Sequence, residues 1–298
     1  MSKNSRNVMS FDGGIHPAGD GKSLSAGSPV RKAPLLDRYT VVISESVGKP
    51  PKPVVKAGDE VKKHQLIAEA DGFVSANLHA PTSGKVIGIV DVQGAMGMPV
   101  PAIQIEADGK DEAAEPMPAL DWRCAPVSDL LKRITDCGVV GMGGAAFPTH
   151  VKLSPPPEKE VDTLILNGAE CEPYLTADHR LMLENPGAVL EGAAISAKIL
   201  GVKNIYIGVE VNKVDAIEAL NRNAADFGVR VVGLKVQYPQ GSEKQLIKAI
   251  TDREVPTGGL PMDAHCVVQN VGTAAAAITV PQTQSDASLK TFPGDMPP

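Results

Sequence analysis

The sequence predicts a protein with two parts, an all-β module followed by an α/β domain. The chain has 298 residues, enough for about two domains that each bury a core. Between residues 39 and 107, short apolar runs are broken by Gly and Pro, a pattern typical of a small β-sheet module. From about residue 122, strand-like and helix-like segments alternate, which favours a sheet covered by helices.

Changes in composition divide the chain further. Residues 1–38 are expected to form an N-terminal arm, and residues 39–108 form the β module. Residues 109–122 are acidic and contain too few large apolar side chains to pack, so they are interpreted as a linker. The α/β domain is expected at residues 123–278, and the polar, Pro-rich residues 279–298 are expected to form a divergent C-terminal tail.

The β module resembles the barrel-sandwich, lipoyl-like fold of lipoyl and biotinyl carrier domains, in which Gly-Asp pairs turn between short strands. In such carriers the modified lysine follows the Asp of the exposed hairpin, but here Asp71 is followed by Gly72. Lys62, Lys63 and Lys85 lie outside the hairpin tip. We therefore expect a docking or structural module rather than an acyl or biotin carrier.

Local signals define most elements of the α/β domain. Ser128 is the predicted N-cap of a helix over residues 129–137, and Gly138 is its predicted end. Further helices are predicted over residues 214–227 and 240–250. Apolar runs predict strands at residues 162–167, 204–211, 229–238 and 266–270.

A longer helical pattern over residues 176–200 contains a proline. Pro186 follows Asn185 and suits the first turn of a helix, so one helix is expected to end and another to begin at this point. Gly201 is the predicted end of the second helix.

Composition excludes several classes of protein. A net charge of -6 argues against nucleic acid as the main partner. The four cysteines form no C-x-x-C pair, so we expect free thiols rather than a disulfide framework or a self-contained iron-sulfur site. The N-terminus has no signal-peptide pattern, and no stretch is apolar for the length of a spanning helix. Any membrane attachment is therefore expected to come through partners.

A glycine-rich stretch, GMGGAAFP, is the first candidate for a ligand site. Gly141, Gly143 and Gly144 carry no side chains, so backbone N–H groups there can approach a flat ring or a phosphate closely. The stretch matches neither the dinucleotide-binding nor the P-loop pattern. Alone, it is equally consistent with a tight connection between elements, and Lys152 beside it with a surface lysine.

An acidic motif, NGAECEPY, follows the apolar run of the first predicted α/β strand. It places Asn167, Glu170 and Glu172 at the carboxyl edge of a sheet, where open α/β folds bind ligands. The starts of the helix at 240–250 and of the segment after 266–270 supply further N–H groups. Without a partner motif, the two glutamates fit a solvated turn equally well.

Single residues with reactive side chains have simpler interpretations. Cys171 lies between two glutamates, but no second Cys or His has ligand spacing with it, so a packed or solvent-facing thiol is expected. His79, His150 and His179 are expected to be hydrogen-bonded surface residues rather than catalytic bases.

Four motifs carry a family resemblance when taken together: FDGGIHP, GGAAFPT, NGAECEPY and QNVGTAA. They resemble the flavin site of the complex I (respiratory NADH dehydrogenase) flavoprotein subunit, and more closely the RnfC family, which belongs to Rnf ion-translocating electron-transport complexes. The resemblance covers roughly residues 11–277. It implies that the α/β domain binds FMN and NADH.

The resemblance also implies which residues form the site. Lys152 would meet a phosphate or a ring oxygen, and Phe147 and Glu172 would lie nearer NADH, with Glu172 as the candidate catalytic residue. No metal ligands are implied. The residues implied to surround FMN are Gly141, Gly143, Gly144, Asn167, Glu170, Gly241, Glu243, Gln269, Asn270 and Thr273.

The function implied is that of the electron-input subunit of an Rnf-type ferredoxin:NAD oxidoreductase. Such a subunit exchanges hydride between NAD(H) and FMN and passes electrons to 4Fe–4S clusters, whose ligands this chain lacks. Its partners would be other subunits of a membrane complex, with ferredoxin reached indirectly. The location implied is the cytoplasmic face of the inner membrane, peripheral and through partners. The alternative is a non-redox assembly or docking subunit of the same kind of complex.

Two departures from the family pattern stand out. Ala146 replaces a third closely spaced glycine, which restricts backbone approach. After Ala277 the chain turns polar, whereas family members continue into SLBB-like and ferredoxin-like cluster regions with repeated cysteine motifs. We therefore expect a truncated chain that cannot itself hold the cluster relay.

Overall fold

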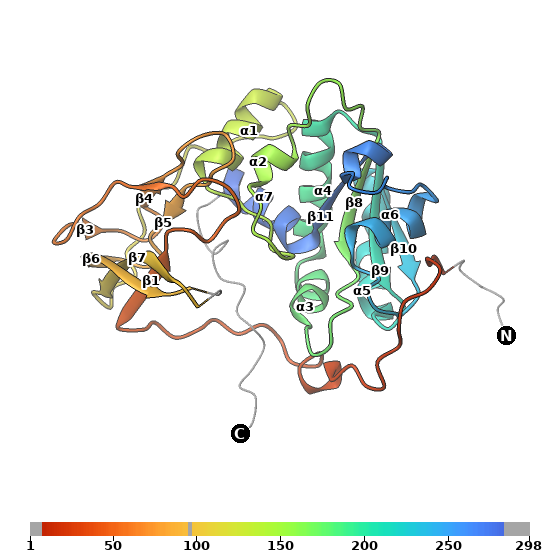
Figure 1. Ribbon diagram of the computed structural model, residues 1–298, viewed down its shortest axis with the longest axis horizontal. Helices are drawn as coiled ribbons and strands as arrows, with labels where there is room; N and C mark the ends of the chain where they lie inside the picture. The colour runs from red at the N-terminus through yellow and green to blue at the C-terminus, as the bar shows by residue number, and fades with distance from the viewer. Residues whose placement is uncertain (1–7, 95–96, 283–298) are drawn as a thin grey trace. The chain divides into compact units, whose positions relative to one another are not determined.

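The computed structural model describes residues 8–94 and 97–282, which fold into two compact units (Figure 1). Among the described residues, the α/β unit contains 8–32 and 153–278, and the β unit contains 33–94, 97–152 and 279–282. The boundaries expected from composition, at residues 108 and 123, remain a prediction. Most of the expected C-terminal tail lies outside the described residues.

Seven short strands build the β unit. They are β1 (Arg38–Val42), β2 (Lys52–Pro53), β3 (Glu60–Val61), β4 (Leu66–Glu69), β5 (Leu78–His79), β6 (Gly84–Gln93) and β7 (Pro99–Ala107). One antiparallel sheet has the order β1-β7-β6-β3, and the other has the order β2-β4-β5. Ile67 from one sheet and Ile103 and Ile105 from the other share one buried core, because alternate side chains of each strand face inward. This is the barrel sandwich that the sequence predicted.

The connection from β4 to β5 carries no lysine. Asp71 forms ion pairs with Lys49 at 2.6 Å and with Lys52 at 3.1 Å. Gly72 follows in a left-handed conformation, with φ at +118°, and Phe73 beyond it is 64% exposed. The tip is therefore a charged and aromatic surface without a group that could carry a prosthetic arm.

Two short helices complete the β unit: α1 (Val127–Asp136) and α2 (Thr149–Lys152). The predicted N-cap is wrong, because α1 begins at Val127 after Pro126 and the Ser128 hydroxyl turns to Asp129 instead. Proline fixes the backbone angle needed just before the first turn, which outweighs the capping preference of serine. The end of α1 at Gly138 is as predicted.

A four-stranded parallel sheet forms the centre of the α/β unit. Its strands are β8 (Thr163–Gly168), β9 (Asn204–Glu210), β10 (Val229–Leu234) and β11 (Cys266–Asn270), in the order β10-β9-β8-β11. Its helices are α3 (Ala177–Glu184), α4 (Pro186–Leu200), α5 (Val214–Asn221), α6 (Glu243–Thr251) and α7 (Val271–Gln282), with single turns η1 (Lys22–Leu24), η2 (Ala224–Phe227) and η3 (Pro261–Ala264). Within the described ranges, no helix is long and apolar enough to cross a lipid bilayer.

Helices cover both faces of this sheet (Figure 1). Leu164 and Leu166 of β8 pack with α4 and α5, whereas Ile165 points to the opposite face and packs with α6. A parallel sheet buries both faces, and successive side chains along a strand alternate between them. The arrangement brings the carboxyl ends of β8 and β11 next to each other, because Asn167 pairs with Asn270.

The break predicted within residues 176–200 is present. The helix α3 ends at Glu184, and Asn185 then accepts a hydrogen bond from Ala188 N at 3.2 Å as the N-cap of α4. Pro186 is the first residue of α4, and Gly201 ends it with φ at +70°. Local sequence signals therefore set both helix ends.

The described part of the expected N-terminal arm packs on the α/β unit. Met9 N donates to Gly233 O at 2.9 Å beside the edge strand β10. Further along, Ile15 and Tyr238 exchange two backbone hydrogen bonds of 2.8 Å. The segment before the β module is therefore structurally part of the domain that follows the module.

We predict that acid destabilises the β unit through His79. Burial, and next the nearby His64, lower the pKa of His79 to about 4 from 6.5. The folded state keeps His79 neutral, whereas the unfolded chain takes up a proton below pH 6.5, so stability is intact above pH 6.5 and falls as pH drops toward 4. From about pH 7 to about pH 5, the unfolding free energy should fall by about 2 kcal/mol.

The measurement is urea denaturation followed by the fluorescence of Trp122, the only tryptophan in the chain, which lies in the β unit. His79→Gln should flatten the pH dependence, whereas His16→Gln, a change at an exposed histidine, should leave it intact. An unchanged slope in His79→Gln would contradict the prediction.

Candidate cofactor site

The carboxyl end of β8 is tied to the start of α6. Asn167 Nδ2 donates to Gly241 O at 2.8 Å, and Asn167 Oδ1 accepts from Ala169 N at 3.1 Å. Gly241 N donates to Cys171 Sγ at 3.2 Å, and a Cβ at position 241 would lie 3.3 Å from that sulfur. Glycine thus permits the close approach. The structure brings together two predicted residues, Asn167 and Gly241.

Glu170 caps the first turn of α3. Its Oε1 accepts from Asp178 N at 2.7 Å and its Oε2 from His179 N at 3.4 Å. A carboxylate at a helix N-terminus satisfies N–H groups that have no partner within the helix. Burial raises the pKa of Glu170, and the neighbouring Asp178 carboxylate raises it further. The predicted FMN residue therefore directs its polar atoms into the protein.

Asn270 plays the same part for α7. Its Oδ1 accepts from Gly272 N at 2.8 Å and from Thr273 N at 3.3 Å, as the N-cap residue of a helix does. Its Nδ2 donates to Asp178 Oδ2 at 2.6 Å. Because Asp178 lies in the turn that Glu170 caps, one network joins the starts of α3 and α7.

Buried glutamine amides gather around the same sheet edge. Gln269 of β11 accepts from Ser196 Oγ at 3.2 Å, but its Nε2 is buried without a partner. Gln240 is fully buried, and neither its Nε2 nor its Oε1 has a partner. Gln237 Oε1 and Gln245 Oε1, which flank the start of α6, are in the same state. Such atoms are costly unless a water or a ligand supplies their hydrogen bonds.

Sequence reasoning selected Gln269 but missed the other three glutamines. Gln240 directly precedes Gly241, so its position beside a predicted residue was visible in the sequence. Its burial was not, because that depends on how the turn after β10 packs. Within the described residues of the α/β unit, every buried side-chain atom without a partner belongs to one of these glutamines.

A buried ion pair lies beneath the loop after β8. Lys213 is 1% exposed, and its Nζ donates to Ala169 O at 2.8 Å and to Glu210 Oε2 at 3.2 Å. Glu210 Oε1 also accepts from Gln237 N at 3.3 Å. Burial raises the pKa of Glu210, and the charge of Lys213 opposes that shift. Neither residue carries a sequence signal that separates it from a surface charge.

The other predicted residues of the α/β unit differ in exposure. Thr273 in the first turn of α7 is 1% exposed, and Glu243, the first residue of α6, is half-buried. Glu172 is exposed at the sheet edge. Among these, only Glu172 presents a carboxylate freely to solvent.

The glycine-rich stretch belongs to the β unit, as do Phe147 and Lys152. Gly141 N donates to Phe147 O at 2.9 Å, which closes a short loop whose exposed residues include Gly143 and Gly144. Since the two units are separate bodies, a single site made from both motifs remains a prediction.

Ala146 occupies the left-handed region, with φ at +49°. This is the position where the family pattern has glycine, and an L-residue other than glycine pays about 1 kcal/mol or more in that conformation. The departure noted in the sequence thus stores strain in the loop.

Two of the histidine predictions are wrong in part. His150 and His179 are buried rather than at the surface, although both are hydrogen-bonded, His150 to Phe73 O at 2.9 Å and His179 to Asp215 Oδ1 at 2.8 Å. Cys171 is a half-buried thiol whose pKa is raised by burial. In the part of the chain that the structure describes, no group of His, Cys, Asp and Glu has the arrangement of a metal site.

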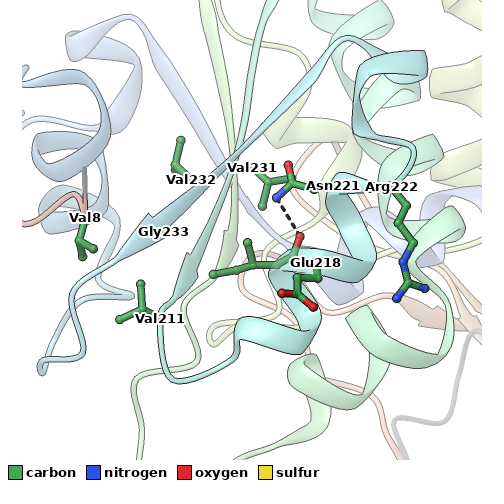
Figure 2. A pocket seen from close by; sticks show the side chains of 9 residues that line it. Val8, Val211, Glu218, Asn221, Arg222, Val231, Val232 and Gly233 are labelled. Atoms are coloured by element: carbon green, nitrogen blue, oxygen red, sulfur yellow. Dashed lines mark hydrogen bonds between the residues drawn. The ribbon is translucent and has the colours of Figure 1, made fainter. Parts of the chain in front are cut away.

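A cavity of about 700 Å³ lies elsewhere in the α/β unit (Figure 2). Its walls come from α5 and from the edge of β10, with Val8, Val211 and Val232 among its lining residues. None of the predicted site residues lines it, and it contains none of the unpartnered glutamines. It is therefore distinct from the candidate site.

Comparison with known proteins assigns both parts of the chain. Residues 9–110 match the family model of the RnfC barrel sandwich hybrid domain, and residues 134–279 match the Nuo51 FMN-binding domain. The RnfC protein of the proton-translocating ferredoxin:NAD(+) oxidoreductase complex of Clostridium ljungdahlii is 53% identical over 90% of this chain. The chain belongs to the RnfC family.

Other RnfC relatives agree with this assignment. The corresponding protein of the Na(+)-translocating ferredoxin:NAD(+) oxidoreductase complex of Acetobacterium woodii is 47% identical over 89% of the chain, and that of the ion-translocating oxidoreductase complex of Pseudomonas aeruginosa is 45% identical over 90%. The chain spans less than two thirds of these relatives' own length, namely 59% of the Clostridium protein, 60% of the Acetobacterium protein and 35% of the Pseudomonas protein. Among solved structures, an NAD+-reducing NiFe hydrogenase in the air-oxidized state aligns with a TM-score of 0.45 and 25% identity, over 54% of this chain and 31% of that one.

We predict that Asn270→Ala destabilises the α/β unit even without a cofactor. The substitution removes the N-cap of α7 and one partner of the buried Asp178 carboxylate. The expected loss is about 2 kcal/mol of unfolding free energy. Urea denaturation followed by far-UV circular dichroism measures it, with the exposed Asn223→Ala as the control. Equal stability of the two variants would show that the cap is dispensable.

Proposed function

We propose that this chain is the electron-input part of an Rnf-type ferredoxin:NAD oxidoreductase. In this role it exchanges hydride between NAD(H) and FMN and passes electrons to iron–sulfur clusters that it does not itself carry. The observation that carries the proposal is the group of buried, unpartnered glutamine amides at the carboxyl edge of the sheet, within the region that matches an FMN-binding domain.

The residues present fit FMN chemically. The edge of its ring offers both hydrogen-bond donors and acceptors, and Gln240 keeps both kinds of atom unpartnered while Gln269 keeps a donor. The starts of α6 and α7 lie at the same edge, and helix N-termini favour the negative charge of a phosphate. The FMN ligands that we propose from the α/β unit are Gly241, Glu243, Gln269 and Thr273, with Gln240 added, and those from the β unit are Gly141, Gly143, Gly144 and Lys152.

Asn167, Glu170 and Asn270 contribute to this site in a different way. Their side chains bind main-chain groups and so fix the course of the loops that surround the cofactor. Loops held in this way keep the donors and acceptors of the site in place before the ligand arrives, which lowers the entropy lost on binding.

When bound, FMN accepts two electrons from NADH as a hydride and returns them one at a time. The exposed carboxylate of Glu172 then serves to accept a hydrogen bond from the nicotinamide carboxamide and orient that ring. Phe147 of the β unit supplies apolar surface on the NADH side. The protein's contribution is positioning and exclusion of water rather than proton transfer.

The partners proposed are the membrane-embedded and cluster-bearing subunits of an Rnf complex, with ferredoxin reached through them. Attachment at the cytoplasmic face of the inner membrane would then come from these subunits. The charged and aromatic tip of the β unit, with Asp71 and Phe73, is the surface proposed to dock against them.

A non-redox assembly subunit is the second candidate. It is favoured by the internal hydrogen bonds of Asn167, Glu170 and Asn270, which leave these side chains fewer atoms for a flavin. In that case the unpartnered glutamines hold water. The two candidates differ in whether a flavin binds and is reduced.

We expect the purified chain to bind FMN and the bound flavin to bleach on anaerobic addition of NADH. The measurement is the visible absorption spectrum with FMN, before and after NADH. A bound flavin that stays oxidised would remove the hydride-exchange role, and an absence of binding would favour the assembly subunit.

Glu172→Gln should slow reduction of the bound flavin by about tenfold without changing FMN affinity, because it weakens a charge-assisted hydrogen bond to NADH. Stopped-flow absorbance gives the reduction rate, and quenching of free-flavin fluorescence gives the affinity. The matched control is Glu158→Gln, at another exposed glutamate. Equal rates for both variants would rule out a role for Glu172.

A further inference from the structure

A lysine from the N-terminal segment lies beneath the loop that carries the acidic motif. Lys22 is only 7% exposed. Its Nζ donates to three main-chain oxygens, those of Glu170 at 2.8 Å, Glu172 at 2.8 Å and Leu175 at 2.6 Å. One ammonium group therefore gathers three carbonyls of residues 169–176, the site loop.

The number of donors matches the number of acceptors. A lysine ammonium has three N–H groups and no acceptor, so three converging carbonyls satisfy it completely. The carbonyls of an irregular loop have no ladder partners, and buried ones need a donor. Burial and the nearby charge of Lys213 lower the pKa of Lys22. The three hydrogen bonds offset this cost of placing a cation inside the protein.

The site loop needs such support because its backbone is strained. Glu170 and Tyr174 both have positive φ, at +49° and +66°. Residues other than glycine rarely adopt this conformation, and it persists only where surrounding contacts over-determine it. The three oxygens that Lys22 binds include that of Glu170 and lie on both sides of Tyr174.

Neighbours of Lys22 in sequence hold the same loop and the helix after it. Tyr174 N donates to Asp20 O at 2.6 Å, and the hydroxyls of Ser25 and Thr176 lie 2.8 Å apart. A Cβ at position 21 would collide with the ring of Tyr174, so glycine allows the segment to pass this closely. Residues 20–26 thus form an N-terminal strap with Lys22 at its centre.

We propose that Lys22 is a positioning residue for the cofactor site. Resting on the function proposed above, this inference assigns to Lys22 the task of holding the site loop in the conformation that presents Glu172 to NADH and Gly241, through Cys171, to FMN. Lys22 touches neither ligand. A segment that precedes the β module in sequence thereby completes a site on the domain that follows it.

The test compares Lys22→Met, which keeps the apolar stem but loses the ammonium, with Lys32→Met, at an exposed lysine nearby. The first readout needs no flavin. It is the rate at which iodoacetamide alkylates Cys171, followed by peptide mass spectrometry, with the exposed Cys124 as internal reference. Lys22→Met should raise the Cys171 rate by about tenfold, because the loop opens more often.

The second readout is ligand binding. Lys22→Met should weaken FMN binding and raise the NADH concentration for half-maximal flavin reduction, each by about tenfold, whereas Lys32→Met should match the wild type. Lys22→Arg should recover part of both, since it restores a cation of different shape. Circular dichroism verifies folding, and should Lys22→Met not fold, Ser25→Ala replaces it because it removes one strap contact while leaving Lys22 in place.

A folded Lys22→Met variant with wild-type Cys171 alkylation would overturn the proposal. So would faster alkylation with unchanged FMN and NADH affinities, because the loop would then not shape the site. If the wild-type chain binds no FMN, the proposed function fails, and the alkylation ratio alone decides whether Lys22 holds the loop.

Discussion

The backbone hydrogen bonds at the carboxyl edge of the parallel sheet are the constraint on which the candidate site depends. The loops and helix starts that follow β8 and β11 place many N–H and C=O groups there without ladder partners. Asn167, Glu170 and Asn270 satisfy the N–H groups, and Lys22 and Lys213 satisfy the carbonyls. The loops can depart from regular structure only because these five side chains supply the missing partners.

This division of labour explains why the site residues are of two kinds. Polar side chains with all their hydrogen bonds inside the protein act as a frame. Gln240 and Gln269 keep buried atoms unpartnered, which lowers stability unless a ligand or water binds them. A stable frame around unsatisfied groups is the arrangement expected of a binding site that is formed before its ligand arrives.

The β unit illustrates how a fold can persist without the chemistry often found on it. Its two sheets share a core of Ile67, Ile103 and Ile105, which depends on alternation along the strands and not on the residue at the hairpin tip. Replacing a carrier lysine with Gly72 therefore leaves the fold intact while it changes the tip to a surface of Asp71 and Phe73. Fold and function are separable in this module.

The sequence by itself determined the order of the elements, the helix ends at Gly138, Asn185 and Gly201, and the family, because these depend on local backbone preferences and on contiguous motifs. Only the tertiary structure decided that α1 begins after Pro126, that Asn167 and Glu170 bind backbone groups, and that Lys22 and Gln240 are buried. A lysine or glutamine has the same local pattern at the surface and in the interior. Its role follows from which distant carbonyls or amides the fold brings to it, and that is a property of packing rather than of neighbouring residues.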